Sequence, residues 1–404
     1  MGVLGVVLML FVAYLFSDNR AAIRWRTVAW GIALQFIFAV FILKVPIGQQ
    51  ALRVVAQSVT AVIEFSSAGS SFVFGHLAND PEYFVFAFKV LPIVIFISSL
   101  FAVLYHLGVM QRVVFLMALI MNRLMGVSGS ESLAAAGNVF LGQTETPIIV
   151  APYISQMTRS ELMALMTGGM ATVSGAFLGG YIALGINAEF LIAASVLAAL
   201  ASLVMAKMIV PETDVSKTGD TVMISVERRD ANVIDAVARG AGKGVILAIN
   251  IAAMLIAFVS LIALLNSAFS FLGETFGLQE SLGVRLSMQW VLGCALAPVA
   301  LIMGVPWVDS FVVGQLIGVK IVLNEFVAYT QMVEVHGALQ AKSELIATYA
   351  LCGFANFSSI GIQIGGIGGL APERRSDLAK LGMRALLAGS LASFMTAALA
   401  GMLT

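Results

Sequence analysis

Long apolar runs set the strongest limit on what this chain can fold into. Three of them read GVLGVVLMLFVAYLF, FVFAFKVLPIVIFISSLFAVL and GVILAINIAAMLIAFVSLIALL. They approach or exceed the roughly 20 residues that an α-helix needs to cross a bilayer. Only 11% of the 404 residues are charged, and the mean hydropathy is +0.99, whereas about a quarter of the residues of a soluble protein are charged. The sequence therefore predicts an all-α polytopic membrane protein.

Eight transmembrane helices are expected. The first run lacks a basic start and a small-residue cleavage site, so it is interpreted as a retained helix and not as a secretory signal. Residues 47–66 place apolar side chains at helical spacing, which is typical of a helix in the membrane interface. Residues 131–157 and 287–329 are apolar but interrupted by Gly and Pro, as in a re-entrant helical hairpin. The predicted spans are 2–16, 27–44, 84–104, 161–186, 187–208, 243–267, 343–369 and 383–403.

The basic residues orient these spans, because Lys and Arg are enriched in cytoplasmic loops. Of the 22 Lys and Arg residues, 16 fall on one side of the predicted layout. Both termini are then expected outside, with the first hairpin entering from the cytoplasm and the second from outside. The mixed-charge loop 207–243 is interpreted as a solvated cytoplasmic connector. The 16 residues are Arg20, Arg24, Arg26, Arg112, Arg123, Arg159, Lys207, Lys217, Arg228, Arg229, Arg239, Lys243, Arg374, Arg375, Lys380 and Arg384.

Hairpins that enter from opposite sides indicate an inverted repeat. The segments that follow them, ELMALMTGGMATVSG and ELIATYALCGFANFSSIG, share Glu-Leu and a Gly-x-Ala-polar-x-Ser pattern. Inverted repeats with broken helices at matching positions are typical of secondary transporters, whose site lies where the repeats meet. The predicted organisation is scaffold spans and interfacial helix 1–83, first repeat 84–208 with broken helix 161–186, cytoplasmic loop 209–242, and second repeat 243–404 with broken helix 343–369.

Two carboxylates stand near the hairpin turns, Glu145 in GQTETP and Glu325 in NEFVAY. A carboxylate at the bilayer centre costs about 2.5 kcal/mol or more, so each should face the interior and have a partner. A structural alternative is a helix cap or an ion pair with Lys320 or Lys89. Two acids in symmetric positions, each beside an amide or a hydroxyl, favour a binding site.

The polar side chains beside these acids suggest the ligand. The amide of Gln143 both donates and accepts, which matches a nucleobase edge, although a helix–helix hydrogen bond is the alternative. Glu325 and Asn356 are suited to vicinal hydroxyls. Phe354 and Phe357 flank Asn356 and either stack on the ligand or belong to the core. None of the polar motifs contains Lys or Arg, which an anionic ligand would require, so a neutral polar substrate is expected. The net charge of +0 gives no indication of nucleic-acid binding.

Asn138 and Thr172 are oxygen-bearing side chains at two predicted helix breaks. With the freed carbonyls of Leu141 and Val173 they could form an all-oxygen sodium site, because unwound carbonyls coordinate Na⁺ in several transporters. Two ordinary intrahelical polar residues are the equally weighted alternative.

At these residues the sequence resembles the concentrative nucleoside transporters. The similarity is carried by GNVFLGQTETP, GGMATVSGAFLGGYIALG, GVPW with VLNEFVAY, and CGFANFSSIGIQIGG, in this order from about residue 85 onward. The resemblance implies eight spans, an interfacial helix, two opposed hairpins, a homotrimer in the bacterial inner membrane, and elevator-type alternating access. It also implies import of a nucleoside such as uridine or adenosine with Na⁺ as the coupling ion.

The resemblance assigns roles to individual residues. Gln143, Thr144 and Glu145 would hold the nucleobase, and Glu325, Asn356 and Ser359 the ribose. Phe354 would line the pocket, and the sodium site would comprise Asn138, Leu141, Thr172 and Val173. Phe177 stands beside the base where a smaller aliphatic residue is common, and Ser174 in ATVSG replaces the alanine of the usual ATIAG. Both departures concern base preference.

Two alternatives remain open. Proton-coupled members differ around GQTET, so the intact motif with Asn138 favours sodium without excluding a proton-coupled transporter. A nucleoside-binding membrane protein without transport is the second alternative. An enzyme is not expected, because the sequence has no Ser-His pair, metal cluster or His-Glu-x-x-His motif.

Overall fold

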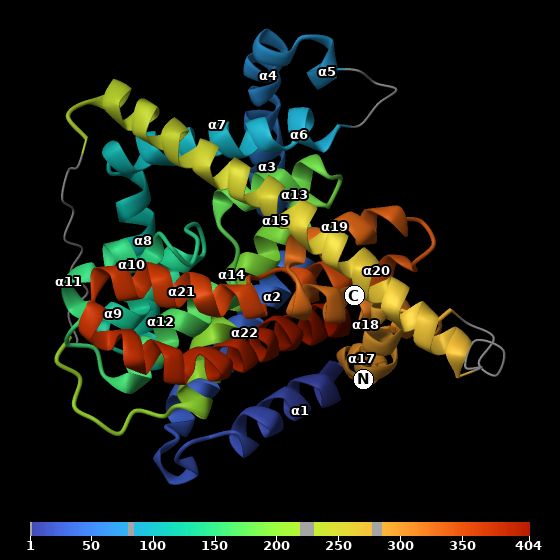
Figure 1. Ribbon diagram of the computed structural model, residues 1–404. Helices are drawn as coiled ribbons and strands as arrows, with labels where there is room; N and C mark the ends of the chain where they lie inside the picture. The colour runs from blue at the N-terminus through green and yellow to red at the C-terminus, as the bar shows by residue number, and fades with distance from the viewer. Residues whose placement is uncertain (1, 80–84, 219–229, 277–284) are drawn as a thin grey trace.

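The computed structural model describes residues 2–79, 85–218, 230–276 and 285–404. Within these ranges every regular element is a helix (Figure 1), so the predicted all-α class is confirmed. Residue 84 of the third expected span lies outside the described residues. So do residues 219–229 of the expected cytoplasmic loop, including Arg228 and Arg229.

The first part of the chain contains a helix at the residues where an interfacial helix was predicted. Pro46 stands in the first turn of this helix, where the missing N–H of proline leaves no bond unmade. Its bounds, Pro46–Glu64, agree with the prediction of 47–66. The elements here are α1 (Gly2–Leu15), η1 (Arg20–Ala22), α2 (Trp25–Lys44), α3 (Pro46–Glu64), α4 (Ser66–Phe74) and α5 (His76–Asn79).

Two further sets of helices follow in the same order: a membrane-length helix, an adjoining helix, a hairpin, a broken helix and a long closing helix. The first set is α6 (Phe86–Lys89), α7 (Leu91–His106), α8 (Val109–Met125), α9 (Gly129–Asn138), α10 (Thr146–Ile149), α11 (Ala151–Ile154), α12 (Arg159–Ala171), α13 (Gly175–Ala183) and α14 (Ala188–Ile209). The second is α15 (Val233–Thr275), α17 (Met288–Met303), α18 (Trp307–Val322), α19 (Glu325–Glu334), α20 (Ala341–Leu351), α21 (Phe357–Leu370), η2 (Pro372–Arg374) and α22 (Arg375–Leu403).

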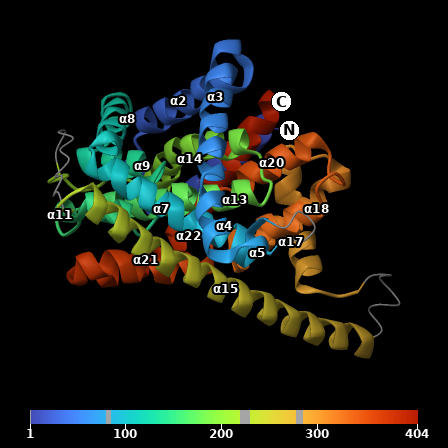
Figure 2. The same cartoon turned by 90° about the horizontal axis from the view of Figure 1, so that it is seen from above.

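Corresponding helices of the two sets pack against each other. α7 lies along α15, and α14 lies along α22 (Figures 1 and 2). Small residues allow the first contact, because a Cβ on Gly244 would lie 2.6 Å from Cα of Ile95 and one on Gly240 would lie 2.7 Å from Cα of Ser99. Gly at four-residue spacing lets two helix backbones approach closely in a membrane. This pairing is the arrangement that a two-fold repeat would produce.

The second hairpin differs from the prediction of 287–329. α17 is a separate helix that meets α18 at 118°, because Gly304 adopts φ +102° and Pro306 precedes α18. The hairpin consists of α18 and α19, with its turn at residues 323–324. The error arose because the Gly and Pro residues that interrupt this region were assigned to the hairpin turn.

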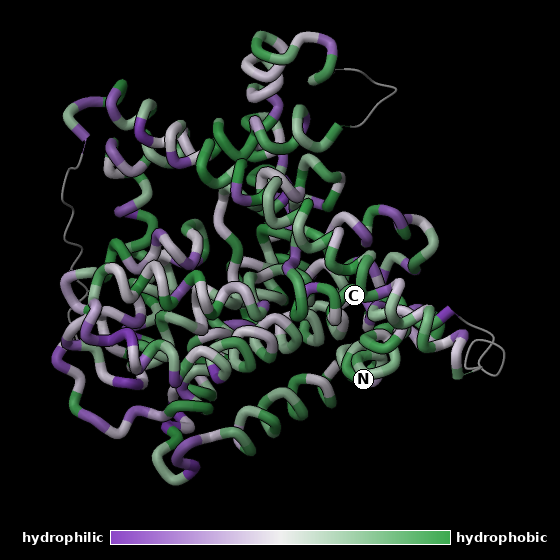
Figure 3. Tube along the Cα trace, in the orientation of Figure 1, coloured by the Kyte–Doolittle hydropathy of each residue, from purple (hydrophilic) through white to green (hydrophobic). Residues whose placement is uncertain are grey.

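Six helical segments in the described part of the chain are long and apolar enough to cross a membrane, or up to seven if α17 and α18 count as one bent span. They are α2, α6–α7, α12–α13, α14, α15 and η2–α22. Hydrophobic residues run along most of their length (Figure 3). The remaining expected spans correspond to α1 and to α20–α21, where α1 and α21 have 14 residues each. The count of eight stays a prediction.

Part of the segment that follows α14 is anchored by polar contacts, whereas Thr213, Asp214, Val215 and Lys217 are exposed. Ser216 Oγ and Thr218 Oγ1 donate hydrogen bonds to Glu161 Oε1, at 2.5 and 2.6 Å. Lys207, at the end of α14, pairs with Glu131 at the start of α9 and donates to Ser160 Oγ at 2.9 Å. The interpretation of this loop as a solvated connector stays a prediction, although Lys207, Ser216 and Thr218 anchor its first part to α9 and α12.

Candidate functional site

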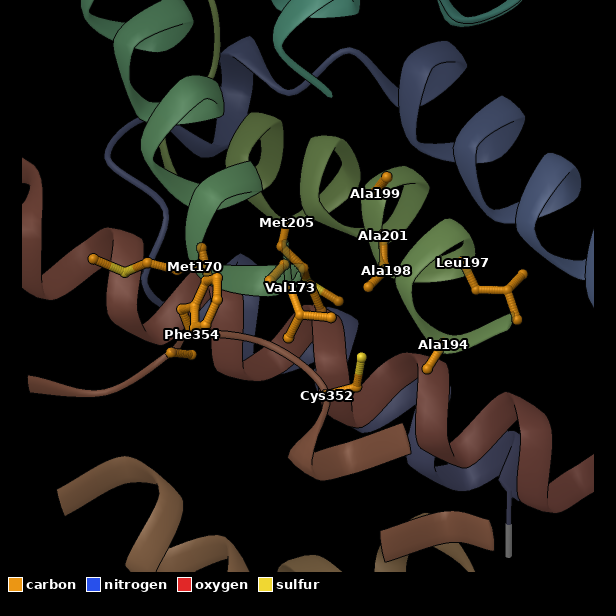
Figure 4. Close-up of a cluster of buried hydrophobic side chains, with 14 of the residues drawn as sticks. Met170, Val173, Ala194, Leu197, Ala198, Ala199, Ala201, Met205, Cys352 and Phe354 are labelled. Atoms are coloured by element: carbon orange, nitrogen blue, oxygen red, sulfur yellow. The ribbon is translucent and has the colours of Figure 1, made fainter. Parts of the chain in front are cut away.

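The two broken helices cross at their breaks. Gly353, in the break between α20 and α21, has φ +130°, and a Cβ on it would lie 2.6 Å from the carbonyl oxygen of Ala171. Figure 4 shows Phe354 and Cys352 of this break beside Met170 and Val173 of the other, against α14. Glycine is required here by both backbone conformation and space. The crossing brings the unwound backbone of both repeats to one place.

Asparagine side chains cap the helices that restart at the hairpin turn and at the second break. Asn324 Oδ1 accepts from Val327 N at 2.9 Å at the start of α19, and Asn356 Oδ1 accepts from Ser359 N at 2.9 Å at the start of α21. Asparagine is among the best N-cap residues because its oxygen accepts an otherwise unpaired backbone N–H. The Asn324 cap fixes the start of α19, whose first residue is Glu325.

Glu325 is 2% exposed and has hydrogen-bond donors from two other elements. Tyr181 of α13 donates its phenol to Oε1 at 2.8 Å. Asn356 donates Nδ2 to Oε2 at 3.2 Å. Hydrogen bonds to a carboxylate are stronger than those between neutral groups, and they offset part of the cost of burying it. The second hairpin is thereby joined to both broken helices.

Gln143 makes the equivalent connection from the first hairpin. Its Nε2 donates to Ser359 Oγ of α21 at 3.0 Å. Its Oε1 accepts from Gln363 Nε2 at 3.2 Å, and the same Nε2 lies 3.0 Å from the carbonyl oxygen of Met166 in α12. The turn of the first hairpin therefore contacts the broken helix of the other repeat.

These contacts form one continuous polar chain. Gln143 donates to Ser359, whose backbone N–H donates to Asn356, and Asn356 donates to Glu325. Tyr181 completes the chain on the far oxygen of Glu325. The structure thus brings together four of the predicted site residues, from both hairpins and the second broken helix, and Tyr181 adds the first broken helix. We call this set, Gln143, Ser359, Asn356, Glu325 and Tyr181, the polar chain.

Aromatic rings border the polar chain. Phe177 meets Phe354 edge-on, with ring centroids 4.9 Å apart at 75°, and Phe177 lies 6.4 Å from the ring of Tyr181. Phe354 is 5% exposed, whereas Phe357 is 49% exposed. Phe177 and Phe354 are therefore placed to line a site beside Tyr181, and Phe357 is not.

Thr144 and Glu145 lie apart from the polar chain. Thr144 is exposed and lies near Gly366 of α21, since a Cβ built on that glycine would lie 3.7 Å from Thr144 Cγ2. Glu145 Oε2 accepts from Gly142 N at 3.0 Å. Its side chain lines a cavity of about 370 Å³ that is bounded by the first hairpin and by residues of α7 and α15, including Tyr105 and Arg239. The structure does not bring these two residues to Glu325.

The predicted sodium ligands lie at the first break. Asn138 is fully buried, and neither Oδ1 nor Nδ2 has a hydrogen-bond partner. Its side chain lies against Gly168, whose carbonyl oxygen accepts from Thr172 Oγ1 at 2.9 Å. Val173 is fully buried and Leu141 is 7% exposed. A buried amide without a partner is costly, and a cation bound to its oxygen would satisfy it, so these residues fit a sodium ion.

Sequence reasoning missed Tyr181 and Gln363. Both stand inside the motif stretches, in GGYIALG and GIQIGG. The available signal was a single hydroxyl or amide in an otherwise apolar helical run. Neither residue adjoins a break, and proximity to the breaks was the criterion for selecting site residues.

Comparison with known proteins gives a consistent result. The chain matches "Na⁺ dependent nucleoside transporter" families at both ends, the N-terminal one over residues 4–77 and the C-terminal one over 190–401, and "Nucleoside recognition" over 87–188. An uncharacterized transporter of Bacillus subtilis, YutK, is 46% identical over 99% of this chain and 98% of its own length. Sodium/nucleoside cotransporter 1 of Mus musculus is 41% identical over 99% of this chain, which spans 63% of the mouse protein.

Solved structures agree. CNTnw in an inward-facing substrate-bound state superposes with a TM-score of 0.94 at 40% identity, covering 100% of this chain and 98% of CNTnw. A double variant of CNTnw in an outward-facing state also gives 0.94 at 40% identity, covering 100% and 97%. These relatives are transporters and not enzymes. With its helical architecture, its two sets of helices in the same order and family matches along nearly its whole length, this chain belongs to the concentrative, Na⁺-dependent nucleoside transporter family.

Proposed function

We propose that this protein imports nucleosides such as uridine or adenosine into the cell together with Na⁺. It would act as a homotrimer in the bacterial inner membrane, with both termini outside. The polar chain carries this proposal, because it places a buried carboxylate, two amides and a hydroxyl from both repeats in one hydrogen-bonded series. A neutral molecule rich in hydroxyl and amide groups matches this series.

The chemistry of the polar chain suggests how a nucleoside binds. Glu325, when ionised, only accepts hydrogen bonds, so it would accept from ribose hydroxyls in place of Asn356 while Tyr181 holds its other oxygen. Gln143 would exchange its bonds to Ser359 and Gln363 for the donor and acceptor edge of the base. Each exchange replaces a hydrogen bond within the protein by a hydrogen bond to the nucleoside. The rings of Phe177 and Phe354 would then contact the base or sugar.

The coupling ion would bind at the first break. Asn138 Oδ1 and Thr172 Oγ1, with the carbonyls of Leu141 and Val173, would supply oxygen ligands. An inward-moving Na⁺ gains about 2.3 kcal/mol per 100 mV of membrane potential. Because about 1.4 kcal/mol corresponds to a tenfold ratio, one ion suffices to concentrate a neutral solute more than tenfold.

Alternating access would be of the elevator type. Hairpins α9–α11 and α18–α19 and the broken helices would move together past the scaffold that includes α7 and α15. CNTnw, which has the same fold, has been solved in inward-facing, outward-facing and intermediate states, which supports a family-wide transition. Nucleobase contacts by Thr144 and Glu145 remain part of the proposal and require a rearrangement of the first hairpin.

The test is radiolabelled uridine and adenosine uptake into proteoliposomes with sodium, lithium or choline outside at fixed pH. Uptake should require sodium, and uptake that persists in choline would indicate proton coupling. Glu325→Ala and Gln143→Ala should abolish uptake, whereas Glu334→Ala, an exposed acid on the same helix α19, should not. Binding without uridine counterflow would show a receptor that does not transport, and full uptake by both site variants would remove the site.

A further inference from the structure

Lys320 is fully buried in the last turn of α18. Its ammonium donates to the carbonyl oxygen of Ala350 at 2.8 Å and to Ser393 Oγ at 3.4 Å. Ala350 belongs to the last turn of α20, immediately before the second break, and Ser393 lies on α22. An ammonium has three donors and no acceptor, and the carboxyl end of a helix attracts positive charge. The second break is therefore occupied by a cation that belongs to the chain.

The first repeat has the same three parts. Asn138 is the last residue of α9, the first arm of its hairpin, and Lys320 stands in the last turn of α18, two residues before that helix ends. Asn138 lies against Gly168 in the last turn of α12. A Cβ built on Gly168 would lie 3.8 Å from Ser202 Oγ of α14, so Ser202 is close to the same glycine. Each repeat thus joins a hairpin arm, the carbonyl end of its broken helix, and a serine of its closing helix.

The two triads differ in one respect. Asn138 leaves both atoms of its buried amide without partners, whereas Lys320 satisfies the corresponding carbonyl and serine with its own charge. Ser393 can accept from Lys320 because its proton is directed to the carbonyl oxygen of Cys352, at 3.0 Å. The first repeat has a place for a free cation, and the second has that place filled.

We propose that the Lys320 ammonium stands at the second repeat's counterpart of the sodium site and acts as a tethered cation. It neutralises the carbonyl end of α20 and limits the protein to one exchangeable ion per nucleoside. This inference rests on the proposed function, because it takes the Asn138 triad to be the sodium site. Lys320 is a positioning residue that sets the number of ions and does not contact the substrate.

The experiment counts ions directly. Equilibrium ²²Na⁺ binding to the purified, uridine-saturated protein should give one ion per chain for the wild type and none for Asn138→Ala. Lys320→Asn, which gives the second triad the side chain of the first, should bind two ions, and the double variant one. Lys342→Asn, at an exposed lysine of α20, should bind one.

The outcomes separate the two proposals. A wild-type protein that binds no sodium overturns the proposed function and this inference with it. If Lys320→Asn is monodisperse and binds one ion, and if the double variant with Asn138→Ala binds none, this inference alone is overturned.

If Lys320→Asn does not fold, Lys320→Arg should keep one-ion binding and uptake. Lys320→Met should then lose uptake by more than about tenfold, since the carbonyl end of α20 would lose the positive charge beside it. Wild-type uptake by Lys320→Met would also overturn the inference.

Discussion

Tyr181 donates its phenol to Glu325 Oε1 at 2.8 Å, joining the first broken helix to the second hairpin. The two residues are 144 positions apart in sequence and both are buried. Tyr181 is therefore the group that holds one oxygen of the central carboxylate in place before a ligand arrives.

Tyr181→Phe should raise the KM for uridine by about 10- to 100-fold, because a hydrogen bond to a charged group contributes about 1.5–3 kcal/mol. Uptake kinetics in proteoliposomes measure this. Tyr349→Phe is the matched control, because Tyr349 is equally buried and its hydroxyl has no partner. Equal KM values for the two variants would show that Tyr181 does not support the site.

Gly353→Ala should destabilise the protein by about 1–3 kcal/mol, because an L side chain is strained at φ +130°. The new Cβ would also lie 2.6 Å from the carbonyl oxygen of Ala171. Thermal unfolding in detergent measures the loss. Gly361→Ala, where a Cβ on α21 meets nothing within 4 Å, should be neutral or slightly stabilising, and a similar loss there would argue against the crossing geometry.

Gly244→Leu should separate α7 from α15, because its Cβ position is already 2.6 Å from Cα of Ile95. Overpacking a tight contact costs about 1–3 kcal/mol or more. Gly242→Leu supplies the control two residues away, where a Cβ has open space. Fluorescence-detected size exclusion after heating should show early loss only for Gly244→Leu, and matching curves would contradict the contact.

Lys207→Met should destabilise the base of the first hairpin by about 3–5 kcal/mol, since removing one partner leaves a buried charge unpaired. The affected acids are Glu131 and Glu212. Lys217→Met removes an exposed lysine of the same segment and should change the unfolding temperature little. A loss of stability shared by both variants would indicate a general effect of charge, not this network.

Residue spacing and polarity were sufficient to predict much of the architecture. The run lengths located the crossing helices, and Gly and polar residues located both breaks within a few residues. Placement of Gln143, Glu325 and Asn356 in one site followed from the inverted-repeat argument, and Ser359 was added by the family resemblance. These features are local in sequence or repeat between the halves, so a single sequence displays them.

Other features depend on tertiary packing that spacing does not encode. α17 was merged with the hairpin because Gly304 and Pro306 resemble a hairpin turn. Tyr181 joined the site only through the approach of α13 to α19. Glu145 was assigned to the site because it stands near a hairpin turn and within a family motif, yet its carboxylate pairs with the backbone N–H of Gly142. In each case the partner residue is distant in sequence or is a backbone atom.

The uninterrupted length of α15 constrains any movement. Its 43 residues measure about 65 Å at 1.5 Å per residue, roughly twice the thickness of the hydrocarbon layer. A helix of this length either is strongly tilted in the bilayer or projects from it, and a continuous helix cannot shorten. Displacement of its neighbours is most easily absorbed where the chain leaves helical geometry, as it does at residues 173–174 and 353–356.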